Sequence, residues 1–309
     1  MTLISIIIPT KDREEIFNKT LQRAFEAIKA TDAEIIVVND SKAKEIVLDK
    51  FYEGVKVIKN PFQGVASARN YGAQCSSSDL LFFLDDDMLI DQDIVHTALA
   101  LHEDNPDFVY NFNWEYPPEL RRQIKQKPFG RFLEHIQFTT MQGWCRGMEW
   151  HDDRMFQTEL VAGATLLISK KKYESIGGYD ASFPLAGAED YDFSKRLLKA
   201  GVKSFIYPMK KAWHNEVNKT EARGFFRRVY NNAITRKHGV NTGYAEMKTN
   251  YSSVKKIIYN TMNFFNRMLL HFAAHWINLR FLDFIYFRFC NMLMGFYIYK
   301  GYNNKPFER

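Results

Sequence analysis

The first hundred residues alternate short apolar runs with segments of helical spacing, and this alternation restricts the fold more than any other feature. Apolar residues three and four positions apart predict a helix over residues 14–29, and a segment rich in small residues predicts another over 64–75. Compact apolar runs between turn residues predict strands at 5–9, 34–38, 55–58 and 80–84. Such alternation is typical of an α/β protein with a mostly parallel, doubly wound sheet and helices on both faces.

Polar side chains follow two of these runs. Right-handed crossovers place the carboxyl ends of parallel strands at one edge of the sheet, where α/β proteins bind their ligands. Asp40 comes just after the second run, and Asp85 directly after the fourth. We therefore expect both in a ligand site at that edge. Beyond residue 106 the pattern is irregular, and the readable elements are strands at 161–169 and 203–207 and helices at 171–176 and 190–199.

Three consecutive carboxylates, Asp85, Asp86 and Asp87, follow the fourth run. Side chains alternate along an extended backbone, so we expect Asp85 and Asp87 to point the same way. A cation relieves the repulsion between adjacent carboxylates, and oxygen ligands suit Mg²⁺ or Mn²⁺, which typically bridge phosphates. The alternative is a solvated acidic turn that caps the next helix. The position directly after a buried strand favours the metal.

A second acidic cluster, which includes Glu189 and Asp190, precedes the helix predicted at 190–199. Two interpretations stay open for it. Acidic residues at a helix N-terminus act as caps and interact favourably with the helix dipole. Alternatively, one carboxylate is a general base for an acceptor hydroxyl. Without further evidence, we expect His214 to have only a structural role and Arg69 to lie on the surface of its helix.

Several motifs in their chain order resemble the family 2 glycosyltransferases with the GT-A fold, inverting enzymes of the bacterial cell-surface glycan type. The resemblance covers about residues 3–215. The motifs are 5–10 (SIIIPT), 36–41 (IVVNDS), 64–72 (GVASARNYG), 82–87 (FFLDDD), 176–180 (IGGYD), 188–193 (AEDYDF) and 196–197 (RL).

The resemblance implies a role for each candidate residue. The nucleotide-sugar set is Pro9, Thr10, Asp40, Arg69, Asp85, Asp86 and Glu189, with the base held by the first three and the ribose by Asp85 or Asp86. The metal set, for Mn²⁺ or Mg²⁺, is Asp87 and His214, and the catalytic base is Asp190. The motif here is three aspartates followed by Met88. Which aspartate contacts the ribose and which binds the metal is therefore uncertain by one position.

The implied reaction is inverting transfer of one sugar from a nucleoside-diphosphate sugar to a hydroxyl of a glycan or polyprenyl-linked glycan. A UDP-sugar is favoured by family frequency, and the absence of a Q-x-x-R-W motif after residue 214 argues against polymerisation. One alternative is a sugar nucleotidyltransferase, although residues 9–13 (PTKDR) lack the glycine-rich loop it would need. Another is a non-catalytic, membrane-associated scaffold with a degenerate transferase fold, against which Asp87, Asp190 and His214 argue.

The chain is long enough for one large domain or two smaller ones. We expect a catalytic domain over residues 1–215, with a nucleotide-binding half (1–105) and an acceptor-binding half (106–215), followed by a helical region (216–309). The three cysteines are far apart, which fits a reducing cytoplasm. The apolar run at 4–8 is too short for a signal peptide or a spanning helix.

Charge is distributed unevenly: residues 210–309 carry a net +12 and residues 1–209 a net −6. Residues 255–300 show a continuous helical apolar stripe, interrupted too often by polar residues for a spanning segment. We expect this basic, aromatic region to bind an anionic membrane, peripherally and on the inner face of the cell membrane. The alternatives are packing on the catalytic domain or pairing in a homodimer. No nucleic-acid partner is expected, because the regular stripe favours packing or lipid.

Overall fold

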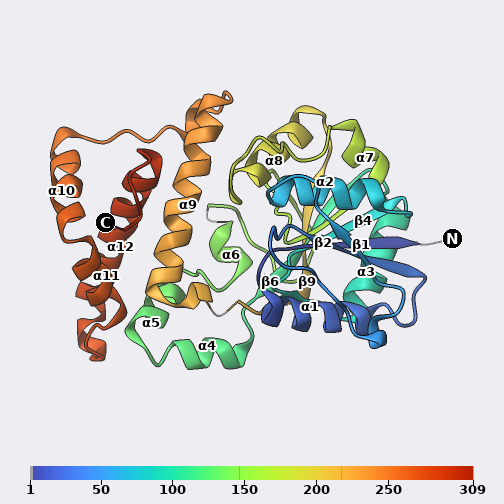
Figure 1. The fold of residues 1–309 in the computed structure, drawn as a ribbon, viewed down its shortest axis with the longest axis horizontal. Helices are drawn as coiled ribbons and strands as arrows, with labels where there is room; N and C mark the ends of the chain where they lie inside the picture. The colour runs from blue at the N-terminus through green and yellow to red at the C-terminus, as the bar shows by residue number, and fades with distance from the viewer. Residues whose placement is uncertain (1–2, 146, 217, 309) are drawn as a thin grey trace. The chain divides into compact units, whose positions relative to one another are not determined.

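The computed structural model describes residues 3–145, 147–216 and 218–308, and the chain divides into two compact units (Figure 1). Unit 1 consists of Met1–Glu115, Gly147–Phe183 and Glu189–Asn215. Unit 2 consists of Tyr116–Arg146, Pro184–Ala188 and Glu216–Arg309. The last segment of unit 1 ends at Asn215, and residues 116–146 group with the C-terminal helices in unit 2.

Unit 1 is built on a nine-stranded sheet with the order β3-β2-β1-β4-β8-β6-β9-β5, and β7 pairs with β9. The strands are β1 (Ile4–Thr10), β2 (Ala33–Asn39), β3 (Lys56–Lys59), β4 (Leu80–Leu84), β5 (Met88–Leu89), β6 (Val109–Glu115), β7 (Phe156–Thr158), β8 (Thr165–Ser169) and β9 (Ser204–His214). The first four strands in this order are parallel, as predicted.

The other half of the sheet is mixed, which the sequence did not indicate. Strand β8 runs antiparallel to both β4 and β6, while β6 and β9 are parallel. Between β6 and β8 the chain passes through residues 116–146 of unit 2.

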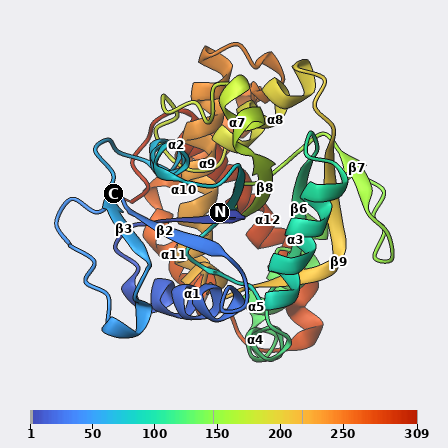
Figure 2. The ribbon, with the colours of Figure 1, turned by 90° about the vertical axis from the view of Figure 1, so that its right-hand side faces the viewer.

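Helices cover both faces of the sheet, as expected: α1 and α3 lie on one side and α2, α7 and α8 on the other (Figure 2). Their bounds are α1 (Glu14–Ala27), α2 (Val65–Cys75), α3 (Gln92–Asp104), α7 (Lys170–Ser175) and α8 (Glu189–Lys199), with a short 3₁₀ turn at Lys50–Tyr52. Helix α2 approaches the sheet closely at Gly72, where an added Cβ would lie 2.4 Å from Ile7 Cγ2. A larger residue there would push α2 away from β1.

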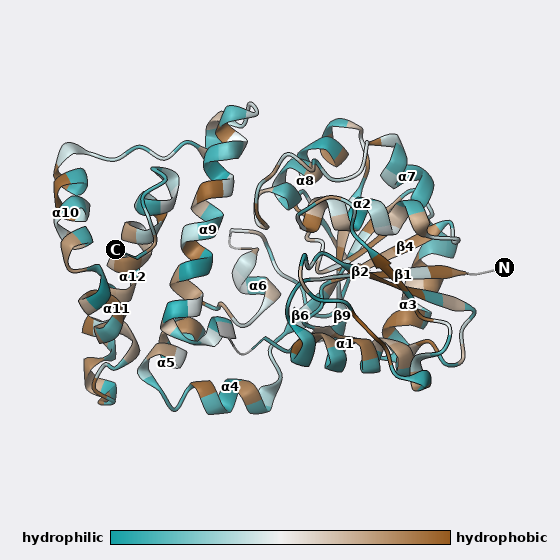
Figure 3. Ribbon diagram, viewed as in Figure 1, coloured by the Kyte–Doolittle hydropathy of each residue, from teal (hydrophilic) through white to brown (hydrophobic). Residues whose placement is uncertain are grey.

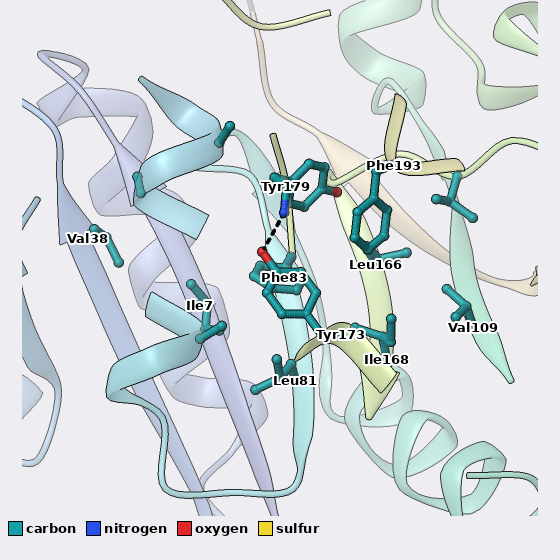
Figure 4. Close-up of a cluster of buried hydrophobic side chains, with 14 of the residues drawn as sticks. Ile7, Val38, Leu81, Phe83, Val109, Leu166, Ile168, Tyr173, Tyr179 and Phe193 are labelled. Atoms are coloured by element: carbon teal, nitrogen blue, oxygen red, sulfur yellow. Dashed lines mark hydrogen bonds between the residues drawn. The ribbon is translucent and has the colours of Figure 1, made fainter. Parts of the chain in front are cut away.

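The core under α2 and α8 reaches the carboxyl edge of the sheet through an aromatic cluster. Tyr179 stacks on Phe193 with ring centroids 4.4 Å apart, and Phe83 meets Tyr179 edge-on (Figure 4). Asn70 fixes the backbone of Tyr179, because its side chain donates to the carbonyl (2.8 Å) and accepts from the amide (2.9 Å). The preceding Gly178 has φ +64°, a conformation that favours glycine. The core thus holds Tyr179 in a fixed place.

Unit 2 is helical in its described residues. The helices are α4 (Pro118–Ile124), α5 (Pro128–His135), α6 (Met141–Trp144), α9 (Ala222–Asn241), α10 (Ser253–Phe264), α11 (Asn266–Ala274) and α12 (Asp283–Tyr302), with 3₁₀ turns at Asn218–Thr220, Ala245–Met247 and Arg280–Leu282. The expected continuous stripe over 255–300 is therefore wrong, since it is broken after Phe264 and after Ala274. One tertiary tether lies in the second break, where Asn278 donates to the Gln126 carbonyl and accepts from Arg131.

Residues 280–302 are long and apolar enough to cross a bilayer by length and composition alone, which the sequence argument had rejected. The same helix also buries one face inside unit 2. Tyr286, Cys290 and Leu293 are fully buried, and α12 packs against α9 and α5. A core helix of this composition meets the same criteria as a spanning helix.

Candidate active site

The aspartate triplet forms a tight turn at the end of β4. The amide of Met88 donates to the carbonyl of Asp85 at 3.0 Å, which closes the turn. The alternation expected for an extended backbone therefore does not apply, and the prediction that Asp85 and Asp87 point the same way is wrong. Instead, Asp86 and Asp87 share Arg13, while Asp85 contacts Arg69.

Arg13 is a site residue that the sequence argument missed. Its guanidinium lies 2.5 Å from Asp86 and 3.0 Å from Asp87, and Thr10 donates to Asp86 at 2.7 Å. Burial raises the pKa of Asp86 to about 7, against the opposing effect of Arg13. Arg13 thus offsets the repulsion within the triplet. Its only signal in the sequence is a basic residue shortly after the first strand.

Strand β9 delivers His214 to the triplet. The strand continues well beyond the predicted end at residue 207, and its last residue, His214, pairs with Met88 of β5. The ring nitrogen Nε2 of His214 lies 3.3 Å from Asp87 Oδ1, and both side chains are buried. Trp114 packs edge-on against the His214 ring at 4.9 Å. A carboxylate and an imidazole thus converge at one point.

This pair fits a divalent ion whose remaining ligands come from a substrate. Carboxylate oxygen suits Mg²⁺ and Mn²⁺, and such ions are often held by one or two protein groups plus phosphate oxygens. Within residues 3–145, 147–216 and 218–308, no group of three or more His, Cys, Asp or Glu side chains is placed to hold a metal by itself. A metal ion held by Asp87 and His214 would therefore need further ligands from outside these described residues.

Arg69 stands at the centre of a second cluster. Its guanidinium lies 2.8 Å from Asp85, 3.3 Å from Glu189 and 3.7 Å from Asp190, and above the ring of Tyr179 at 4.9 Å. Although burial alone would lower the pKa of Arg69, the carboxylates hold it above its ordinary value. Arg69 is therefore a buried cation that ties the triplet to the start of α8, and not a surface residue.

The acidic side chains at the start of α8 have different partners. Asp192 pairs with Arg196 one turn later, an ion pair within the helix. Asp190 instead faces the Arg69 cluster, accepts a hydrogen bond from the Gly163 amide at 2.9 Å, and keeps a quarter of its side chain exposed. Burial raises the pKa of Asp190, opposed by Arg69 and assisted by Asp85. An accessible carboxylate with a raised pKa is suited to accept a proton.

Gly163 is a second residue that the sequence argument missed, because it lies within a run read simply as a strand. A Cβ at this position would lie 2.3 Å from the Arg69 guanidinium carbon. Gly163→Ala should therefore displace Arg69 from Asp85 and Asp190, and we expect kcat/KM to fall about 10–100-fold, as for other displaced positioning groups. Steady-state kinetics checks this. Ala162→Ser, which leaves Arg69 unobstructed, is the matched control. Equal activity in the unaltered protein, Gly163→Ala and Ala162→Ser would contradict the prediction that Gly163 makes room for Arg69.

The predicted base-binding residues lie at the ends of β1 and β2. Pro9 pairs with Val38, and Thr10 lines a small cavity of about 90 Å³. The carboxylate of Asp40 is occupied by the chain itself: it accepts from Asn60 at 2.6 Å and from the Gly64 amide at 3.1 Å, and it meets Lys11 at 3.3 Å. Asp40 thus holds the turn that starts α2.

Two family models match the chain. The model of "Glycosyl transferase family 2" matches residues 5–159, and that of "N-terminal domain of galactosyltransferase" matches residues 151–220. An uncharacterized glycosyltransferase of Haemophilus influenzae is 28% identical over 200 residues, which are 64% of this chain and 62% of that protein. A validoxylamine A glucosyltransferase of Streptomyces hygroscopicus subsp. limoneus is 28% identical over 229 residues, covering 65% of this chain and 49% of that protein.

The chain therefore spans between about half and 62% of the length of these relatives. The crystal structure of GalNAc-T7 with UDP, GalNAc and Mn²⁺ matches 69% of this chain and 43% of that one, with a TM-score of 0.50 and 16% identity. This likeness confirms the predicted GT-A type of fold. The family 2 model spans half of the chain, from β1 through β7, and includes the aspartate triplet, so the chain belongs to glycosyl transferase family 2.

Proposed function

We propose that this family 2 glycosyltransferase is an inverting enzyme that moves one sugar from a nucleoside-diphosphate sugar to a hydroxyl of a glycan acceptor. Action on nucleotide sugars follows from the family. The finer assignment rests on Asp190, a partly exposed carboxylate with a raised pKa that is held at the carboxyl edge of the sheet by Arg69 and Gly163. We propose a glycan or polyprenyl-linked glycan of cell-surface polysaccharide biosynthesis as the acceptor.

In the proposed reaction the acceptor hydroxyl gives its proton to Asp190 while its oxygen bonds to the anomeric carbon. The bond from that carbon to the diphosphate oxygen breaks, and its electron pair leaves with the diphosphate. Attack from the face opposite the diphosphate inverts the configuration. Arg69 acts as a positioning residue, because its charge and hydrogen bonds fix Asp85, Glu189 and Asp190 relative to one another.

For the divalent ion we propose Asp87 and His214 as the protein ligands, with Mn²⁺ or Mg²⁺ as the metal. When bound, the ion would neutralise the negative charge that builds on the departing diphosphate. The 3.3 Å approach of Asp87 and His214 supports this assignment. The GalNAc-T7 structure with UDP and Mn²⁺ supports a divalent ion and a uridine nucleotide.

For the nucleotide we propose that Pro9, Thr10 and Asp40 contact the base, which requires the half-exposed Lys11 to move away from Asp40. We assign the ribose to Asp85. Its side chain is about one-third exposed, whereas that of Asp86 is 7% exposed and already tied to Thr10 and Arg13. Of the two alternatives that the motif left open, the exposed fractions thus favour Asp85.

A donor screen tests the proposal. Purified protein with Mn²⁺ is incubated with UDP-, GDP- and dTDP-sugars, and free nucleotide is quantified. We expect slow release of the nucleoside diphosphate, fastest with a UDP-sugar. Formation of a nucleoside triphosphate and a sugar 1-phosphate when pyrophosphate is added would instead indicate a nucleotidyltransferase. No turnover of any donor, with or without glycan acceptors, would favour the non-catalytic scaffold.

A further inference from the structure

Unit 2 exposes a concentration of large apolar side chains along α10, α11 and the start of α12. Of the 23 such side chains exposed in the described residues, 13 lie within residues 254–292. The most exposed are Phe264 (80%), Phe281 (78%), Val254 (66%) and Ile257 (66%). Brown, hydrophobic positions recur along these three helices (Figure 3). Single exposed apolar residues are ordinary, but a series of this density marks an interaction surface.

These side chains follow one stripe on α10. Val254, Ile257 and Ile258 lie three and four positions apart, so they share a face of the helix. The adjoining flank packs inside unit 2, where Tyr259 meets the ring of Tyr299 and Met262, one turn after Ile258, is buried. A helix on a water-exposed surface normally carries polar residues opposite its packed face. Helix α10 instead exposes apolar side chains beside its packed ones.

The same segment is strongly basic. Residues 247–307 contain one acidic residue, Asp283, and eight basic ones: Lys248, Lys255, Lys256, Arg267, Arg280, Arg288, Lys300 and Lys305. Arg131 neutralises Asp283 through two hydrogen bonds of 2.7 and 2.8 Å. Lys255, Lys256 and Arg267 are exposed next to the apolar stripe. The surface therefore combines apolar side chains with uncompensated positive charge.

We infer that this apolar-basic face, formed by the exposed side chains of residues 254–292, docks on an anionic lipid bilayer. Its Phe, Ile and Val side chains enter the boundary between headgroups and acyl chains, while Lys and Arg meet the anionic headgroups. Charge complementarity selects this occupant. Two copies of one cationic face would repel each other in a homodimer, whereas anionic lipid attracts it.

The test is flotation of the full-length chain with vesicles of phosphatidylcholine alone or mixed with phosphatidylglycerol. We expect binding to the mixed vesicles and its loss at high salt. Lys255→Ala with Lys256→Ala should weaken the partition coefficient about thirtyfold, since each basic residue near an anionic surface contributes about fivefold. These changes are safe for folding, because they remove positive charge from the N-terminal turn of α10, where the helix dipole disfavours it.

Phe264→Ser with Phe281→Ser removes the two most exposed rings and should also abolish flotation. Phe62→Ser, a 68% exposed phenylalanine of unit 1, is the matched control and should float like the unaltered chain. Light scattering without vesicles gives the mass of each protein. Absence of flotation with anionic vesicles, flotation that neither double variant weakens, or a dimer that Phe264→Ser with Phe281→Ser dissociates would each overturn the inference.

Discussion

Replacing Asp190 with asparagine should lower kcat by about 10²–10⁴-fold, the range that general-base catalysis typically contributes. Asparagine keeps the size of the side chain and an oxygen that accepts from the Gly163 amide. It cannot take the acceptor proton. Donor affinity should stay nearly unchanged, because the nucleotide is assigned to other residues. Single-turnover kinetics and calorimetry with UDP separate the two effects.

The matched control is Asp192→Asn, in the same turn of α8. Asp192 pairs with Arg196 and not with the Arg69 cluster, so its loss should cost stability more than turnover. The pH profile gives a second readout. Because the pKa of Asp190 is raised, the acid limb of kcat should lie above the ordinary range of an aspartate, and Asp190→Asn should remove it. Normal turnover in Asp190→Asn would exclude Asp190 as the base.

Replacing Asp87 with alanine should remove the metal dependence of donor binding. Asp87 Oδ1 faces His214 and Oδ2 faces Arg13, so the substitution deletes the carboxylate shared by the proposed metal site and the triplet. Changes outside a metal's own ligands typically cost 10–100-fold in affinity. We expect loss of a ligand to weaken UDP binding in Mn²⁺ by about 100-fold or more, and calorimetry with and without Mn²⁺ measures it.

Two controls accompany this substitution. Asp93→Ala removes an exposed aspartate of unit 1 that pairs with Lys210, and it should leave UDP binding unchanged. Thermal unfolding shows whether Asp87→Ala is folded, since its removal leaves Arg13 and His214 without a shared partner. A folded Asp87→Ala protein with unchanged affinity for UDP in Mn²⁺ would remove Asp87 from the metal site.

The nucleotide-binding half of the fold could be predicted because its signals are local. Strands β1, β2 and β4 are continuous apolar runs, and α1 and α2 keep helical spacing, so the sequence placed all five within a few residues. Unit 2 could not be predicted in this way. The helical region expected over 216–309 contains α9, but the bounds of that helix were not predicted, and the break after α11 depends on tertiary bonds such as that of Asn278 to Gln126.

In the candidate site, too, the residues could be predicted from local motifs, whereas their contacts could not. Motifs identified the aspartates, Arg69, Asp190 and His214, but not how they meet. That Asp86 and Asp87 share Arg13 follows from a turn that replaces extended backbone, and an acidic triplet does not reveal it. Gly163 matters because a buried guanidinium occupies the space that a side chain would fill. The need for glycine at position 163 comes from Arg69, which is far away in the sequence, so the local sequence does not reveal it.

The division of the chain into interleaved segments limits how this enzyme can change by recombination. The chain passes between the two units five times, so neither unit can be exchanged as one contiguous cassette. A cut after Asn215 would strip Phe225 and Phe226 from Phe129, whose ring lies 5.6 and 5.9 Å from theirs. Exchange of either unit would therefore need several cuts, and a chain that ended at Asn215 would leave residues 116–146 without the helices with which they group.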